Sequence, residues 1–225
     1  MTQAKKILDF YHTLSVPTAL PDGVAIMNPY QHKKAAGLAS QFYERYYNDT
    51  NQRVLILGIN PGRFGGGVTG IPFTDPIKLE TQCGIKNDFE KRTELSADFI
   101  YRMIAAYGGV DSFYSRFYIG AVCPLGLTLN GKNLNYYDTP EVERAFRDFI
   151  LSSLQAQLDF PLNRERCFCL GEGKNFKYIT QLNQKNAFFK QIIPLAHPRF
   201  IMQYRRKKVE EYVRLYVSTL GVGNR

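Results

Sequence analysis

The chain has 225 residues, of which 44% are hydrophobic and 22% charged, which is typical of one globular domain with a sizeable core. Its 29 Lys and Arg against 20 Asp and Glu give a net charge of +9, which favours a polyanionic partner. No apolar run approaches the roughly 18 residues of a membrane span, and the first residues, MTQAKK, lack the apolar segment of a signal peptide. We therefore expect a cytoplasmic monomer without membrane contact.

Helices are predicted in the N-terminal region, about residues 1–50. Apolar residues at helical spacing from Ile7 to Leu14 predict a first helix, which Pro17 ends. A connector rich in Pro, Gly and Asp follows it. A second helix is predicted from about Tyr30 to Tyr47 because Leu38, Phe42 and Tyr46 form an apolar side.

Beyond residue 50, four short apolar runs alternate with helical segments. Strands are predicted at Val54–Ile59, Phe117–Val122, Cys167–Leu170 and Gln191–Leu195, and helices at about Leu95–Tyr107, Pro140–Leu158, Glu172–Asn183 and Tyr204–Leu220. Strands that alternate with helices indicate βαβ units. We expect an α/β fold over residues 1–225: a single-domain, three-layer sandwich with a central, mainly parallel four-stranded sheet flanked by helices.

The stretch VLILGINPGRFGGGVTGIPF (residues 54–73) carries the strongest functional signal. The first strand stops at Asn60-Pro61-Gly62, where proline cannot donate to a sheet ladder. Thirteen residues beyond Asn60, Pro72 presents the ring of Phe73. An amide at the carboxyl end of a central strand, followed by glycines and a ring, indicates a pocket for a flat heterocycle, since α/β sheets bind ligands at that edge.

The segments Gly58–Gly62 and Thr69–Phe73 together resemble the first motif of the single-strand-selective monofunctional uracil-DNA glycosylases, a branch of the uracil-DNA glycosylase superfamily. The resemblance implies the fold of that superfamily and hydrolysis of the bond between a damaged base and its sugar in DNA. It implies that Asn60 holds the attacking water, that Phe73 stacks on the base, and that Ile59, Gly62 and Phe64 line the base site.

A second motif lies at His197-Pro198, directly after the last predicted strand. In a parallel sheet this position shares an edge with Asn60. It resembles the start of the superfamily's second motif, usually His-Pro-Ser-Pro, although the chain continues with Arg199 instead. The resemblance implies that a neutral His197 stabilises the departing base anion. Asp75 is the rival to Asn60 for activating water, unless it only forms the turn before Pro76.

Several residues around the second motif are candidates for contacting DNA. The apolar stretch Phe200, Ile201 and Met202 is either a wedge between bases or the buried start of the last helix. Basic side chains nearby either bind phosphates or form a solvated helix face; they are Arg199, Arg205, Arg206 and Lys207. Gly66, within Gly65–Gly67, either lets the backbone approach DNA closely or belongs to a flexible loop.

The chain departs from the family pattern at Ala121. The family's third strand carries an Asn that reads the base edge, whereas this chain has Ala121 before its matching Cys123-Pro124-Leu125. A methyl group cannot make that contact, which predicts a relaxed pocket accepting several deaminated or oxidised bases. Asn133 is either a replacement reader or an organiser of its loop.

We expect neither a cofactor nor a metal. The four cysteines form no C-x-x-C pair, which favours buried core thiols over an iron–sulfur or zinc site. The favoured function is a monofunctional DNA glycosylase acting on uracil or a related base, in single- or double-stranded DNA. The alternatives are a non-catalytic reader of damaged or single-stranded DNA on the same scaffold, and a nucleotide or nucleoside hydrolase.

Overall fold

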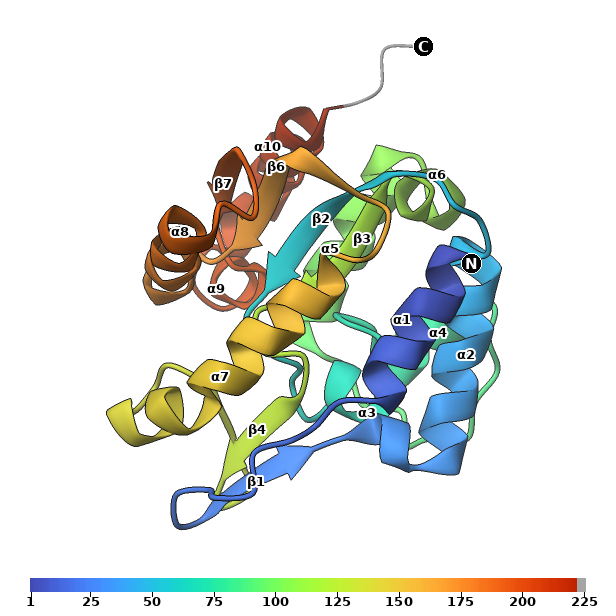
Figure 1. Ribbon diagram of the computed structural model, residues 1–225. Coiled ribbons are helices and arrows are strands. Elements are labelled where there is room, and N and C mark those ends of the chain that lie inside the picture. Colours follow the sequence, from blue (N-terminus) through green and yellow to red (C-terminus); the bar gives the residue numbers. More distant parts are fainter. Residues whose placement is uncertain (222–225) are drawn as a thin grey trace.

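A four-stranded parallel sheet forms the centre of the protein, in a computed structural model that describes residues 1–221. Its strands lie in the order β3-β2-β6-β7, and each neighbouring pair is parallel. Helices cover both faces (Figure 1). The predicted α/β sandwich is therefore confirmed. The strands are β2 (Arg53–Gly58), β3 (Phe117–Ala121), β6 (Leu162–Leu170) and β7 (Gln191–Leu195).

The long helices lie within a few residues of their predicted positions, and α1 and α2 pack side by side (Figure 1). Thr2 caps α1 and Thr139 caps α7, each accepting a backbone N–H of the first turn. The first helix ends before Leu14. The long helices are α1 (Gln3–His12), α2 (Lys33–Tyr47), α5 (Leu95–Tyr107), α7 (Pro140–Gln157), α8 (Lys174–Asn186) and α10 (Val209–Leu220).

The structure also contains short strands and helices that the hydrophobic periodicity of the sequence did not predict. A second, antiparallel sheet in the order β1-β4-β5 consists of β1 (Val24–Met27), β4 (Gly126–Leu129) and β5 (Lys132–Leu134). The last helix, predicted from about Tyr204, consists of η2 (Arg206–Lys208) and α10, and a further short helix, α9 (Pro198–Tyr204), precedes it. The remaining short helices are η1 (Pro29–Gln31), α3 (Gly66–Thr69), α4 (Pro76–Thr81) and α6 (Val110–Tyr114). None of the helices in residues 1–221 combines the length and apolar character needed to cross a membrane.

Strand β2 is anchored at its amino end by Arg53, whose side chain is fully buried. The guanidinium donates to both carboxylate oxygens of Asp49, at 2.7 and 2.8 Å, and to the side chain of Gln3. It also donates to the backbone oxygens of Tyr46 and Tyr114. A buried cation with this many acceptors ties α1, the end of α2 and the strand together. The opposite end of β2 is thereby held in a fixed place.

Candidate active site

A cleft of about 790 Å³ opens where the parallel strands end. Asn60 follows β2, Ala121 ends β3 and His197 follows β7, and all three line the cleft. Gly58 of β2 pairs directly with Ala121 of the edge strand β3, so at this pair the sheet presents only a hydrogen and a methyl group. The sheet therefore brings the two sequence motifs into one cleft, at the edge predicted from the parallel topology.

The side chain of Asn60 is fixed by the small second sheet. Its amide nitrogen donates to the backbone oxygen of Leu134 at 3.0 Å, and its Oδ1 accepts the backbone N–H of Tyr136 at 3.3 Å. These bonds assign oxygen and nitrogen within the amide. Oδ1 keeps one further lone pair, which is enough to accept one hydrogen bond from a bound molecule.

Phe73 lies against the sheet floor with a positive φ of 53°, which is uncommon for a residue with a side chain. A Cβ at Gly58 would lie 2.9 Å from Cε2 of Phe73, so the ring requires glycine beneath it. The Phe73 and His197 rings are 6.0 Å apart between centroids and inclined at 52°. A flat, half-buried aromatic surface and an imidazole thus share the cleft.

His197 is held in one orientation by its own helix. Its Nδ1 accepts the backbone N–H of Arg199 at 3.1 Å, at the start of α9. In the neutral imidazole the proton is therefore on Nε2, which is a donor. Burial and then the charge of Arg199 lower the pKa of His197 to about 4. At neutral pH, the cleft contains an uncharged N–H donor at this position.

Asp75 does not lie in the cleft. Its side chain is fully buried, and Oδ1 accepts the backbone N–H of Lys78 at 2.7 Å as the cap of α4. Oδ2 accepts the backbone N–H of Glu94 at 2.9 Å. Both oxygens are engaged away from the cleft, which favours the second interpretation of Asp75, the turn before Pro76, over a role in activating water. Asp75 instead joins α4 to the residue that starts α5.

That residue, Glu94, is a cleft carboxylate that the sequence interpretation missed. Burial, and after it the charge of Asp75, raise the pKa of Glu94 to about 7, while Arg199 opposes the shift. Its only sequence signal was a carboxylate just before an apolar helix, which is also the ordinary pattern of a helix start. The carboxylate that lines the cleft is therefore Glu94, which was not predicted, and not Asp75.

The remaining base-site candidates have distinct positions. Ile59, Gly62 and Phe64 line the cleft, and the guanidinium groups of Arg63 and Arg92 lie 4.6 and 5.2 Å from the centroid of the Phe64 ring. Asn133 is exposed, and its Oδ1 accepts the backbone N–H of Arg63 at 3.1 Å. That bond supports the role of Asn133 as an organiser of the loop that follows Asn60, although Asn133 also lines the cleft.

Of the three residues considered as an apolar wedge, two are buried in the structure and only Phe200 is exposed. Ile201 is fully buried and Met202 is 4% exposed, because this side of α9 packs against α5. Phe200 is 39% exposed and contacts the ring of Tyr204, which is 62% exposed, at a centroid distance of 5.6 Å. Both rings line the cleft, and Tyr204 was not predicted.

The remaining candidates for DNA contact also divide into buried and exposed residues. Gly66 is buried at the start of α3, where an added Cβ would lie 3.1 Å from the oxygen of Ile71, and it does not line the cleft. The basic side chains are exposed on α9 and the residues after it: Arg199, Arg205, Arg206 and Lys207. The guanidinium of Arg205 lies 5.3 Å from the centre of Phe200.

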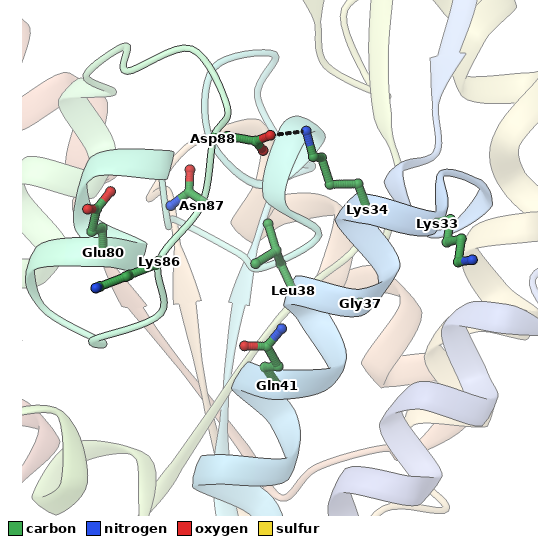
Figure 2. A pocket seen from close by; sticks show the side chains of 9 residues that line it. All are labelled: Lys33, Lys34, Gly37, Leu38, Gln41, Glu80, Lys86, Asn87 and Asp88. Atoms are coloured by element: carbon green, nitrogen blue, oxygen red, sulfur yellow. Dashed lines mark hydrogen bonds and ion pairs between the residues drawn. The ribbon is translucent and has the colours of Figure 1, made fainter.

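The four cysteines are buried free thiols, and burial raises the pKa of each. Within residues 1–221 no group of three His, Cys, Asp or Glu side chains is placed to hold a metal ion. A second cavity, of about 850 Å³, lies between α2 and the segment after α4 (Figure 2). An ion pair from Lys34 to Asp88 crosses it, and its lining includes none of the motif residues.

Comparison with known proteins agrees with this geometry. The family described as Uracil DNA glycosylase superfamily matches residues 44–221 of the chain. The chain belongs to the uracil-DNA glycosylase superfamily. A solved structure, wild-type SMUG2 of Pedobacter heparinus, is 46% identical, with 97% of each chain covered and a TM-score of 0.94. The superfamily match includes both motifs, Asn60 to Phe73 and His197-Pro198, and confirms the resemblance on which the sequence interpretation rested.

Proposed function

We propose that this protein is a monofunctional DNA glycosylase that hydrolyses the N-glycosidic bond of uracil or a related damaged base. The observation that carries the proposal is the meeting of Asn60, Phe73 and His197 in one cleft, where backbone hydrogen bonds hold the side chains of Asn60 and His197. Membership of the uracil-DNA glycosylase superfamily supports it. The cleft offers three groups that the reaction uses: a stacking surface, a water site and an anion-stabilising donor.

The roles follow from the charge that develops as the bond breaks. The departing base gains negative charge, and the neutral Nε2–H of His197 donates a hydrogen bond to its carbonyl oxygen. An imidazole with a pKa near 4 is uncharged near neutral pH and keeps its Nε2–H as a hydrogen-bond donor. Phe73 stacks on the base, and the free lone pair of Asn60 Oδ1 accepts a hydrogen bond from the attacking water.

The surface beside the cleft supports DNA as the substrate carrier. A base in a duplex must leave the base stack to reach the floor of the cleft, and this unstacking costs about a few kcal/mol. Phe200 and Tyr204 offer exposed rings for the neighbouring bases, and the cations from Arg199 to Lys207 offer phosphate contacts. Ala121, buried at 4% exposure, adds only a methyl group to the floor, which favours a pocket that accepts more than one base.

The first test is base release from labelled oligonucleotides containing uracil, hypoxanthine, xanthine or hydroxymethyluracil, both single- and double-stranded. We expect release by the wild type and a loss of at least about 1,000-fold in the Asn60→Ala/His197→Ala double variant, because a water site and an anion donor are removed together. His12→Ala is the matched control, since His12 is exposed on α1 and outside the cleft.

The outcome also separates the glycosylase from a non-catalytic reader on the same scaffold. Binding of lesion-containing DNA without release of any base would contradict the glycosylase and favour the reader, for which Ala121 in place of the base-reading Asn is the supporting observation. Equal loss in His12→Ala would show a general effect on the protein rather than on the cleft.

A further inference from the structure

The carboxylate of Glu94 occupies a space that the glycine-rich loop leaves for it. Its Oε1 lies 3.2 Å from the position of a Cβ on Gly62, and a Cβ on Gly65 would overlap Oε2. The amide nitrogen of Asn133 lies 3.7 Å from the same Gly62 position. Because Gly62 is two residues from Asn60, the carboxylate lies beside the loop that presents the Asn60 side chain.

The carboxylate is not used to hold the helix that it begins. Glu94 is the N-terminal cap residue of α5, yet its side chain makes no capping hydrogen bond. The backbone is instead fixed by Asp75, which accepts the Glu94 N–H. In the described part of the chain, the carboxylate forms no ion pair, and its hydrogen-bonding contact is the Ser96 hydroxyl. A carboxylate has more acceptor positions than one hydroxyl satisfies, which leaves capacity for a ligand or water in the cleft.

The charged groups around Glu94 are of both signs. Asp75 at the start of α4 and Asp98 on α5 raise its pKa, and Arg199 on α9 and the Ser96 hydroxyl lower it. Arg63 and Lys132 also line the cleft, together with the neutral His197. Burial outweighs the cations, which leaves the carboxyl a stronger base than an exposed one.

We propose that Glu94 is the general base of the reaction, a role that rests on the proposed glycosylase function. A water molecule has two protons, and the Asn60 Oδ1, already bonded to Tyr136, accepts only one of them. The Glu94 carboxylate accepts the other. As the sugar–base bond breaks, its electron pair leaves with the base nitrogen. The water oxygen bonds to the sugar carbon, and its proton moves to Glu94 and from there to solvent.

The test compares single-turnover base release by the wild type and Glu94→Gln between pH 5.5 and 8.5, on the best substrate of the wild type. The wild-type rate is expected to rise with pH through about 7, because only the ionised carboxylate accepts the proton. Glu94→Gln is expected to lose about 100-fold at pH 8 and to lose the rise. Its binding to an oligonucleotide with a non-hydrolysable 2′-fluoro nucleoside is expected to stay within about threefold.

Glu80→Gln is the matched control, because Glu80 lines the second cavity (Figure 2) and its carboxylate forms an ion pair with Lys91. It removes the same charge and is expected to keep both the rate and the pH profile. A Glu94→Gln rate within about threefold of the wild type, or a reduced rate that still rises with pH, would overturn the general base. If the wild type releases no base from any substrate, the glycosylase itself fails, and Glu94 has no such role.

Discussion

Two titratable side chains in the cleft, Glu94 and His197, have pKa values shifted in opposite directions. Burial is the larger cause of both shifts, raising the Glu94 pKa to about 7 and lowering that of His197 to about 4. Each shift favours the uncharged form. Near neutral pH, His197 is thus a neutral donor and Glu94 is divided between acid and carboxylate, which separates the donor from the base.

The raised pKa of Glu94 makes a prediction about stability. The unfolded carboxyl ionises near 4.5 and the folded one near 7, so the folded state binds the extra proton between these values. Stability is therefore lost as pH rises through that window. Glu94→Gln is expected to be more stable than the wild type at pH 8, by roughly 1 kcal/mol after screening. The gain should disappear below about pH 4.5; thermal unfolding at both pH values checks this, and a gain equal at both would contradict it.

At the residue scale, motifs predicted some positions and burial decided others. Asn60, Phe73 and His197 were predictable because each follows a recognisable strand in a motif. Glu94 was not, since a carboxylate before a helix usually serves the helix. Ile201 and Met202 could be a wedge or a buried helix start on sequence alone, because a seven-residue helix, α9, is too short to show which of its apolar residues are buried.

At the scale of elements, strands of five or more residues were predictable and shorter ones were not. β4 and β5 have four and three residues, and such lengths show no clear alternation. Yet β5 ends at Leu134, whose oxygen accepts from Asn60. Strand β5, which the sequence did not predict, therefore helps to orient the side-chain amide of Asn60.

The buried side chain of Arg53, at the amino end of β2, leads to a prediction about stability. Arg53→Met leaves Asp49 and several buried acceptors without their donor, so we expect a loss of about 3 kcal/mol and a Tm lower by roughly 6–12 °C. Arg144→Met removes an exposed pair with Glu141 and is expected to change stability by at most about 0.5 kcal/mol. Chemical denaturation of both variants measures this. Equal stability of the two would show that the buried network contributes little.

For the whole molecule, the alternation of strands and helices predicted the parallel sheet, and its carboxyl edge predicted where the motifs meet. Net charge was less informative, because +9 favours a polyanion without placing it. The structure adds the location. Exposed cations follow α9, directly beyond the two exposed rings at the cleft mouth.

That location predicts the salt dependence of DNA binding. If Arg205, Arg206 and Lys207 each neutralise a phosphate, their joint change to Gln should lower the slope of log Kobs against log salt by about 2–3, because each contact releases about one counterion. The control changes Lys33, Lys177 and Lys185 to Gln, which alters the net charge equally at exposed positions that do not line the cleft. Binding of a lesion-containing oligonucleotide from about 50 to 300 mM salt measures both. Equal slopes for the two triple variants would mean that the cations after α9 are only a solvated face, and that DNA reaches the cleft along another surface.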